Sequence, residues 1–309
     1  MAKYIIKRVV YMFLSLFLIA SFTFALSKLL PGSPLASASK LSVEQREVVY
    51  EKYGLNDPIP VQYVRYMGNL AKGDFGISFQ YKNANVKDLI IKKLEYSMIL
   101  GMQALVLGTV IGIILGMIAA LKQNTVWDYG STIVAIVGIS VPSFVFAVLL
   151  QYVFAVWLEI LPVGLWEGWK SSILPSIALA MGPLAISARF IRTEMIEVLS
   201  SDYILLAKAK GANMFEIAFK HAFRNALIPL ITILGPVAAG LLTGSLVVEQ
   251  IFAIPGIGAQ FVTSISTNDV SLIMGTTIFF SIFLISIILI VDILYGIIDP
   301  RIRLSGGSK

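Results

Sequence analysis

The chain has 309 residues, of which 57% are apolar and 14% are charged, and its formal net charge is +6. Soluble domains are about 45–50% apolar and about 25% charged, so this composition excludes a disordered chain and argues against a soluble enzyme. The absence of cysteine excludes a disulfide scaffold, a thiolate metal site and a cysteine nucleophile. The class that fits is an all-α, polytopic membrane protein.

Six apolar stretches are long enough to cross a bilayer core of about 30 Å, which needs roughly 20 helical residues. Lipid offers backbone groups no hydrogen-bond partner, so each stretch is predicted to be a helix. The predicted spans are Val9–Leu30, Ser97–Leu121, Ser131–Leu158, Ile173–Ala188, Ala226–Val248 and Leu272–Val291. Kinks are expected at the prolines inside them, Pro142, Pro183, Pro229 and Pro236.

The distribution of Lys and Arg predicts the orientation of these spans. The short loops 159–171 and 249–271 contain a single basic residue, Lys170, whereas the opposite ends of the spans are rich in Lys and Arg. We therefore expect six spans with both termini in the cytoplasm. The alternative is a cleavable signal peptide ending at Ala36-Ser37-Ala38, but its apolar core of about 22 residues exceeds the usual 7–15.

This topology divides the chain into a cytoplasmic segment with the first span (1–30), an extracytoplasmic helical insert (31–96), a core of five spans (97–300) with a cytoplasmic loop at about 192–225, and a tail (301–309). In the insert, Ser42 with Gln45 predicts a capping box for a helix that Gly54 ends. Asp57 before Pro58 predicts a second helix that Gly73 ends. The insert is interpreted either as two amphipathic helices on the outer membrane surface or as a docking surface for an external partner.

The sequence contains no recognisable catalytic constellation. Its one histidine, His221, lies in a basic loop, and Ser245 has no His or Lys partner within a span. The last five spans lack the titratable residues that ion-coupled transport normally requires. Gly68 and Gly73 have the glycine spacing of a phosphate-binding loop, but Asp74 follows where lysine is needed. Any nucleotide that drives transport must therefore bind to a separate chain.

The longest cytoplasmic loop, roughly 189–225, carries the clearest local signals. Asp202 is expected to cap a helix over 203–210, Gly211 to take a left-handed turn, and a second short helix to begin near Asn213. Helical spacing predicts one apolar stripe made of Phe215, Ala218, Phe219, Ala222 and Phe223. The loop is interpreted either as an elbow on the membrane surface or as a helical knob that fits a groove on a cytoplasmic partner.

The segments Asp202-Tyr203-Ile204, Ala207-Lys208-Ala209-Lys210-Gly211 and His221-Ala222-Phe223-Arg224-Asn225 resemble the "EAA" loop of permease subunits from binding-protein-dependent ABC importers. Where the general motif begins Glu-Ala-Ala, this chain has Leu205-Leu206-Ala207, which argues against a salt bridge to the ATPase from that position. The order of further blocks is similar to the B-type permease of the oligopeptide, dipeptide and nickel branch. These blocks are Tyr4–Arg8, Leu30–Pro34, Gly73–Ser78, Ser140–Phe144, Leu161–Gly164, Ile173–Ser176, Glu249–Phe252, Pro255–Gly258 and Asp299–Arg301.

The resemblance implies a type I ABC importer permease fold and an assembly with a second, C-type permease, two ABC ATPase subunits and an extracytoplasmic solute-binding protein, in a bacterial cell membrane. It implies that this chain is not an enzyme and binds no cofactor, metal or nucleic acid, with ATP and Mg on the ATPase subunits. The loop around Gly211 would be the coupling helix. Its expected contact residues are Asp202, Ala207, Gly211, Ala212, Asn213, Met214, Phe215 and Glu216.

Two further groups are expected outside this loop. Polar candidates for the solute path are Gln103, Ser140, Ser143, Gln151 and Thr243, although such residues more often join helices to one another. The resemblance suggests an outer gate just beyond the fifth span, at Glu249, Phe252, Pro255, Gly256 and Gly258, where the plain interpretation is a Gly/Pro turn. The preferred substrate is an oligopeptide, and dipeptides or nickel chelates are alternatives. From other classes, a stand-alone secondary transporter and an intramembrane enzyme remain as hypotheses.

Overall fold

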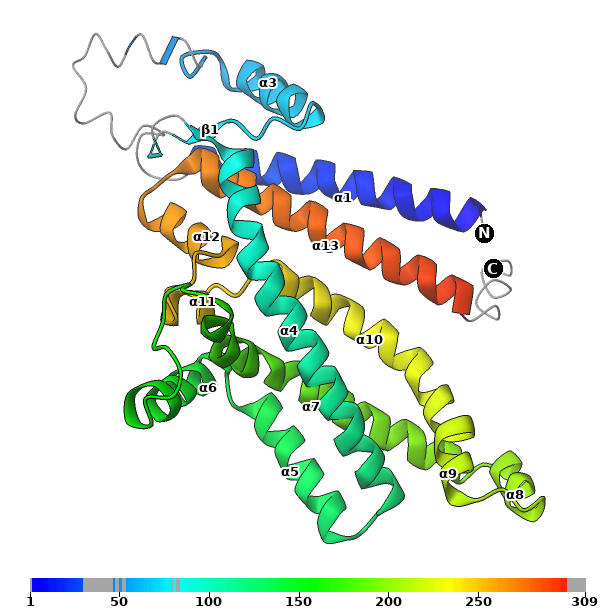
Figure 1. The fold of residues 1–309 in the computed structure, drawn as a ribbon. Helices are drawn as coiled ribbons and strands as arrows, with labels where there is room; N and C mark the ends of the chain where they lie inside the picture. The colour runs from blue at the N-terminus through cyan, green and yellow to red at the C-terminus, as the bar shows by residue number, and fades with distance from the viewer. Residues whose placement is uncertain are drawn as a thin grey trace.

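The structure, a computed structural model, describes residues 2–29, 47, 50–51, 54–78, 80–81 and 84–298. The chain is mostly helical in these ranges, and its long helices slope from the upper left toward the lower right of Figure 1. They are α1 (Ala2–Leu29), α4 (Val86–Leu121), α7 (Ile173–Leu199), α10 (Arg224–Leu242) and α13 (Val270–Ile298). The Ser42–Gln45 capping box, the alternative cleavage site at 36–38 and the tail 301–309 lie outside the described residues.

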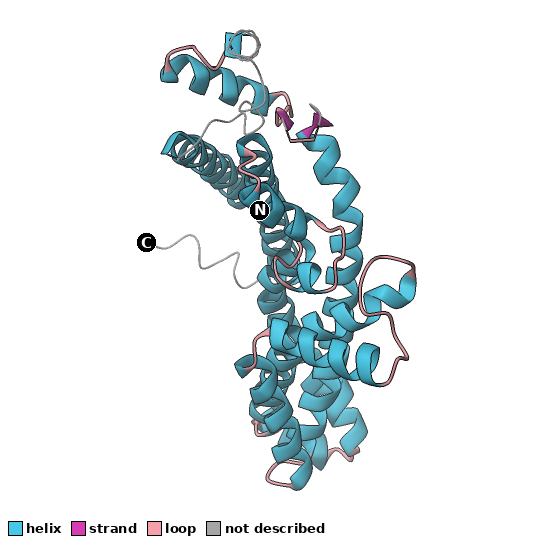
Figure 2. Ribbon diagram, turned by 90° about the vertical axis from the view of Figure 1, so that its left-hand side faces the viewer, coloured by secondary structure: helices cyan, strands magenta, loops and turns pink. Residues whose placement is uncertain are grey.

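Shorter elements connect the long helices. In Figure 2 they complete one elongated body, with the two short strands near one of its ends. They are α3 (Ile59–Ala71), β1 (Ile77–Ser78), β2 (Ala84–Asn85), α5 (Val126–Ser140), α6 (Ser143–Leu150), the π-helix η2 (Gln151–Trp157), the 3₁₀-helix η3 (Trp169–Ser172), α8 (Asp202–Ala209), α9 (Met214–Glu216), the π-helix η4 (Ile217–Phe223), α11 (Val248–Ile251) and α12 (Ile257–Ser266).

Four helices are long and apolar enough to cross a membrane: Ile6–Leu29, Val86–Leu121, Trp169–Leu199 and Val270–Val291. Two bent pairs meet the same criteria when each is taken together. They are Val126–Ser140 with Ser143–Trp157, bent by 103°, and Met214–Leu227 with Pro229–Leu242, bent by 49°. The described chain therefore has four to six candidate spans, and the bends lie at two of the predicted prolines, Pro142 and Pro229. Pro183 lies inside α7, which runs on through it.

The second and fifth helices differ from their predicted ranges. α4 begins at Val86 rather than Ser97, because the Asn85 side chain accepts a hydrogen bond from the Lys87 N–H and caps the helix early. α10 ends at Leu242 rather than Val248, because Gly244 adopts a positive φ of 92° and turns the chain away. Apolar composition predicts the part of a helix that faces lipid, but it does not predict the residues at which the helix begins and ends.

The insert contains structure that was not predicted. β1 pairs antiparallel with β2, Ile77 opposite Asn85, and strands of two residues are too short to show a sequence alternation. α3 begins after Pro58 as expected and Gly73 follows its end with a positive φ of 74°. The Asp57 side chain does not cap α3; instead it forms an ion pair with Arg65 at 2.6 Å.

The centre of the fold is the contact between α4 and α7. Gly108, Gly112 and Gly116 recur every fourth residue on α4, and a Cβ atom on any of them would come closer than 3.0 Å to a backbone carbonyl oxygen of α7. These oxygens belong to Ala180, Leu184 and Ala188, which also recur every fourth residue. Small residues at this spacing allow helix backbones to approach closely in membranes, where packing replaces the hydrophobic effect as the driving force.

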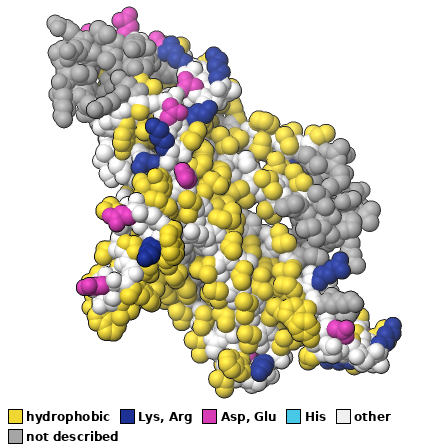
Figure 3. Space-filling model, in the orientation of Figure 1, with side chains coloured by type: hydrophobic (Ala, Val, Ile, Leu, Met, Phe, Trp, Pro, Cys, Tyr) yellow, Lys and Arg dark blue, Asp and Glu magenta, His cyan; other side chains and the backbone are white. Residues whose placement is uncertain are grey.

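An ion pair joins α5 to α7 at one end of the α4–α7 contact. Asp128, in the first turn of α5, is almost fully buried and accepts two hydrogen bonds from the Arg192 guanidinium on α7, at 2.6 and 2.9 Å. It also accepts from the Asn124 N–H at 3.0 Å. In Figure 3 the visible charged side chains lie at the upper left, down the left edge and along the bottom and lower right, with a mostly apolar surface between them. That arrangement suits a body whose middle lies in lipid.

We predict that Gly112→Ala destabilises the protein, because the added methyl group would overlap the Leu184 carbonyl oxygen. Overpacking of this kind costs about 1–3 kcal/mol. The matched control is Gly182→Ala on α7, where a Cβ atom meets nothing within 4 Å and where alanine favours the helix. Thermal unfolding in detergent should show a lower Tm for Gly112→Ala alone. An equal Tm for the two variants would contradict the tight α4–α7 contact.

Candidate functional site

The predicted cytoplasmic loop forms two short helices joined by a tight turn. α8 ends at Ala209, and Gly211 takes a positive φ of 84°, as predicted. The Gly211 N–H donates to the Lys208 carbonyl at 3.0 Å, and the Ala212 N–H donates to the Ala207 carbonyl at 3.1 Å. These two bonds define a Schellman motif, which satisfies carbonyl groups at the end of α8. The turn is thus fixed by its own backbone hydrogen bonds.

The segment after the turn is also capped locally. The Asn213 side chain accepts from the Glu216 N–H at 2.8 Å, and the Glu216 carboxylate accepts from the Asn213 N–H at 3.3 Å. This reciprocal capping box starts α9 where the sequence predicted a helix. At the other helix the N-cap residue is Ser201, whose Oγ donates to the Val198 carbonyl at 2.5 Å and does not cap an N–H of α8, so the prediction that Asp202 is the cap was wrong by one residue. Asp202 lies in the first turn of α8.

The loop is anchored to the rest of the protein on its inner side. Ile204 is fully buried, and Asn225 Nδ2 donates to the Tyr203 hydroxyl at 2.9 Å, which joins α8 to the start of α10. Ala218 and Ala222 are buried in the same apolar cluster as Ile191 and Met195 of α7. The loop is therefore held by α7 and α10 together.

The predicted single stripe is divided in the structure. Ala218 and Ala222 are buried, whereas Phe215 is 70% exposed and Phe219 is 44% exposed. The cause is the π-helix η4: its wider turns separate residues three apart, such as Phe219 and Ala222, while residues four apart still lie together. The rings of Phe215 and Phe219 lie 4.4 Å apart, so the phenylalanines form their own aromatic group beside the buried alanines.

Four large apolar side chains of the loop are exposed beside its charged residues. Leu205, Leu206, Met214 and Phe215 expose more than half of their surface, with Leu205 and Phe215 at 70% each. Exposed apolar patches of this kind mark sites of interaction with another protein or with lipid. We call these four residues the inner apolar face.

A second candidate site lies at the opposite end of α10, around a buried carboxylate. Glu249 is fully buried, and its Oε1 accepts from Ser97 Oγ on α4 at 2.7 Å and from the Ser245 N–H at 3.2 Å. Its Oε2 accepts from the Ala259 N–H at 3.0 Å in the first turn of α12. Free N–H groups at a helix start carry partial positive charge and favour an anion. Glu249 thereby joins α4, α11 and α12, and we call this the Glu249 junction.

Glycines make room for this junction. A Cβ atom on Gly256 would overlap Glu249 Oε2, and one on Gly244 would lie 2.7 Å from Oε1. A Cβ on Gly258 would lie 2.7 Å from the Ser245 backbone. The Gly/Pro segment of the expected outer gate is therefore closely packed around the carboxylate.

Burial raises the pKa of Glu249 above its ordinary value of 4.5, although hydrogen bonds from Ser97 and from backbone N–H groups act to lower it. Since the pKa is higher in the folded state, this group's contribution to stability is fully present below pH 4.5 and is lost as the pH rises through the raised value. Ionisation of Glu249 thus lowers the free energy of unfolding. The hydrogen bonds to the carboxylate make this loss of stability smaller.

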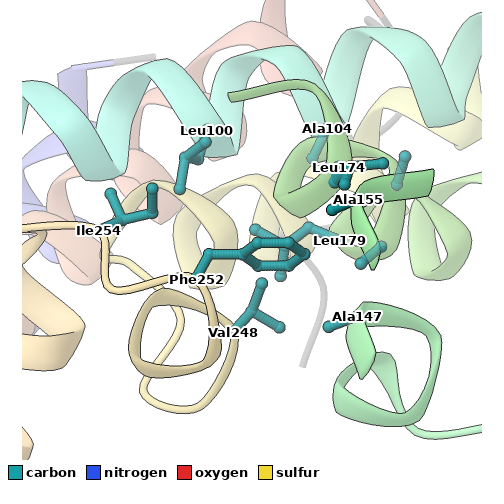
Figure 4. Packing of buried hydrophobic residues seen from close by; sticks show 11 residues of the cluster. Leu100, Ala104, Ala147, Ala155, Leu174, Leu179, Val248, Phe252 and Ile254 are labelled. Carbon is teal, nitrogen blue, oxygen red and sulfur yellow. The ribbon is translucent and has the colours of Figure 1, made fainter. Parts of the chain in front are cut away.

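Phe252 completes this region from the apolar side. It is fully buried in a cluster with Leu100 of α4 and Leu174 of α7, shown in Figure 4. Its carbonyl accepts from the Leu165 N–H at 2.8 Å, and Gly164 approaches the same carbonyl closely. Pro255 is half-buried nearby in the sequence. The loop after η2 is thereby attached to the end of α11.

The polar residues predicted to line a path mostly have partners within the chain. Gln103 Oε1 accepts from Ser176 Oγ at 2.8 Å. Gln151 Nε2 donates to the carbonyls of Val163 at 2.6 Å and Ile251 at 3.2 Å. Thr243 Oγ1 donates to the carbonyls of Ala239 and Gly240 in its own helix. Ser140 and Ser143 are exposed beside the α5–α6 break. Among the hydrogen bonds of the described residues, none joins two of the five.

A smaller buried junction attaches the hairpin to the last helix. Ser78 Oγ donates to the buried Asp269 carboxylate, which also accepts from the Leu272 N–H at 3.2 Å. Burial raises the pKa of Asp269. Sequence reasoning missed this pair and the Ser97–Glu249 bond, since both connect distant segments. It also missed the α4 glycines, whose regular spacing was a readable signal.

The described residues contain no group of three His, Cys, Asp or Glu side chains that could hold a metal ion. What the geometry presents is a bundle of apolar helices with an apolar face at one end and a buried anchoring network at the other. These features indicate an integral membrane protein, and comparison with known proteins supports that class.

A family model described as "Binding-protein-dependent transport system inner membrane component" matches residues 112–304, and a model of the N-terminal part of such components matches residues 1–101. The chain therefore belongs to this family of membrane permeases of ABC importers, within its peptide branch, and is located in the bacterial cytoplasmic membrane.

Several relatives match along nearly the whole chain. The chain is 47% identical to the "Dipeptide transport system permease protein DppB" of Lactococcus lactis over 98% of its own length and 100% of the relative's. It is 44% identical to the DppB of Bacillus subtilis, over 98% of this chain and 99% of the relative. It is 45% identical to the "Oligopeptide transport system permease protein OppB" of Haemophilus influenzae, over 98% and 100%. These relatives are permease subunits rather than ATPases.

One solved structure shows the same fold. A chain from the "Crystal structure of an amino acid ABC transporter with histidines" superimposes with a TM-score of 0.52 at 16% identity, covering 70% of this chain and 94% of that one. The identity is low, so this likeness concerns the fold alone.

We predict that Glu249→Ala destabilises the protein, because it removes the acceptor for Ser97 and for two backbone N–H groups in a buried place. Each buried donor left without a partner costs about 1–3 kcal/mol. The control is Gln250→Ala, since the neighbouring Gln250 side chain is exposed. Thermal unfolding in detergent should show a lower Tm for Glu249→Ala only, and Glu249→Gln should fall between the two. If Glu249→Ala unfolds at the temperature of Gln250→Ala, the junction does not stabilise the fold.

Proposed function

We propose that this chain is the B-type permease subunit of an ATP-driven importer and forms the peptide path together with a second, C-type permease. In this proposal it crosses the membrane six times with both termini in the cytoplasm, each bent helix pair counting as one span, and its segment 31–96 lies outside. The membership of the peptide branch of the permease family and the names of its relatives support the proposal.

The observation that carries the coupling part of the proposal is the inner apolar face on a rigidly capped loop. We assign this face to an ABC ATPase subunit, because it is exposed, is apolar and lies on the side that positive charge predicts to be cytoplasmic. ATP and Mg would be held by two such subunits. The contact would comprise Leu205 and Leu206 of this face together with the residues predicted from the sequence: Asp202, Ala207, Gly211, Ala212, Asn213, Met214, Phe215 and Glu216.

An extracytoplasmic solute-binding protein would deliver the peptide at the opposite end. In the proposal the Glu249 junction is the fixed part of an outer gate, because its carboxylate holds three helices in one place. Phe252, Pro255, Gly256 and Gly258 belong to the same gate. The path residues remain Gln103, Ser140, Ser143, Gln151 and Thr243, with Ser140 and Ser143 the best placed since both are exposed beside a helix break.

The substrate class is peptides, and we propose oligopeptides as the preferred cargo. The second candidate is dipeptides, which the relative with 47% identity favours. The oligopeptide relatives match at 43–45%, so similarity supports both lengths about equally.

Uptake by the reconstituted importer tests the function. Proteoliposomes that contain this chain with its co-purified subunits and binding protein should accumulate a labelled pentapeptide when ATP is supplied. Unlabelled pentapeptide should compete better than unlabelled dipeptide. Uptake that a proton gradient drives without ATP would overturn the importer assignment, whereas stronger competition by dipeptide would overturn only the preferred length.

A further prediction concerns the turn at Gly211. Gly211→Val should abolish ATP-dependent uptake, because a β-branched residue is strained at a φ of 84°. Gly211→Asn should retain uptake, because asparagine tolerates this conformation. A Cβ atom at this position meets nothing within 4 Å, so the two variants differ in conformation and not in available space.

Membrane insertion, measured as the amount of each variant in washed membranes, should be equal for the two substitutions. Equal uptake by both variants would show that the left-handed turn is not required for coupling.

A further inference from the structure

α3 lies above the C-terminal part of α1 in Figure 1, and side chains join the two helices. The Tyr63 hydroxyl and Ser21 Oγ share a hydrogen bond of 2.7 Å, and the Phe24 ring contacts the rings of Tyr63 and Tyr66. Lys28 Nζ donates to Gln62 Oε1 at 2.5 Å. Ser21 lies about two turns, or roughly 12 Å, before the end of α1 at Leu29. Part of α3 is therefore level with the membrane-spanning portion of α1.

The three sides of α3 have different chemistry. One side carries Tyr63, Tyr66 and Leu70, which are partly buried. A second, polar side carries Gln62, Arg65 and Asn69. The third side is exposed and carries no charge. At helical spacing it consists of four apolar residues and one glycine: Pro60, Val61, Val64, Gly68 and Ala71. We call it the third side of α3; Val64 on it is 69% exposed.

The contacts with α1 show which way these sides face. Gln62, on the polar side, meets Lys28 at the end of α1, whereas Tyr63, next to the third side, meets Ser21 deeper along the same helix. The polar side of α3 therefore faces the end of α1, and the third side faces its middle. This assignment depends only on positions along α1 and not on which compartment lies outside.

We propose that the third side of α3 lies on the acyl chains of the membrane leaflet next to it, so that α3 is an interfacial helix that remains in lipid. Its division into an apolar side toward the middle of the span and a polar side toward its end is the arrangement of helices in the membrane–water interface. The tyrosines have the amphipathic character that is enriched at this depth. Arg65 stays on the polar side and is paired with Asp57 at 2.6 Å.

The natural absence of cysteine makes a direct test simple, because single cysteines can be spin-labelled without background. Val64→Cys and Gly68→Cys place a nitroxide on the third side, and a Cβ atom at Gly68 meets nothing within 4 Å. Asn69→Cys, the next residue, is the matched control on the polar side. Phe17→Cys on α1, which is half-exposed, supplies a reference for lipid.

The purified full-length chain, with the subunits that accompany it, is reconstituted into nanodiscs of phosphatidylcholine and phosphatidylglycerol. Power saturation then compares collisions of each nitroxide with oxygen, which enters lipid, and with a nickel chelate, which stays in water. The labels at Val64 and Gly68 should favour oxygen, as at Phe17, and the label at Asn69 should favour nickel.

Two outcomes would overturn the proposal. Nickel access at both Val64 and Gly68 would mean that the third side of α3 faces water. An immobilised label with little access to either collider would mean that another protein covers this side. The result is independent of peptide transport, since it measures only the surroundings of α3.

Discussion

The close contact between α4 and α7 is the constraint on which the rest of the structure depends. Three glycines on α4 allow the two backbones to meet, and the carbonyls that they face belong to a helix that continues without interruption past Pro183. Apolar side chains cannot drive this association in lipid as they do in water, so direct backbone packing takes their place. The Asp128–Arg192 pair and the Glu249 junction each attach further helices to this central pair.

The two candidate functional regions lie at opposite ends of that pair and are stabilised differently. The inner loop is shaped by local hydrogen bonds, the Schellman motif at Gly211 and the capping box at Asn213, and its apolar face is exposed. The outer region is shaped by a buried carboxylate whose partners come from three helices. An exposed face on a rigid support suits contact with another subunit, whereas a buried network suits a fixed position.

These differences explain what the sequence could predict. The membrane class and most spans follow from long uncharged apolar stretches, and the turn at Gly211 and the start of α9 follow from neighbouring residues. The role of Glu249 could not be derived, because Ser97 lies 152 residues away along the chain. The single phenylalanine–alanine stripe was wrong because spacing rules assume an α-helix, and η4 is a π-helix. The six-span topology and the path residues remain predictions.

The glycine contact also limits how the protein can deform. α7 leads directly into α8, and α4 carries Ser97 toward the opposite end. The cytoplasmic-loop segment and the Glu249 junction are therefore both attached to the α4–α7 pair. This packing resists sliding of α4 along α7, because each α7 carbonyl would have to move away from one α4 glycine and past a larger residue before it reached the next glycine. A displacement applied at the inner loop is thus carried as a whole-body tilt over roughly 40 Å, the length of α7. The bends of 103° at Pro142 and 49° at Pro229 lie outside this helix pair, so the glycine contact does not restrain them.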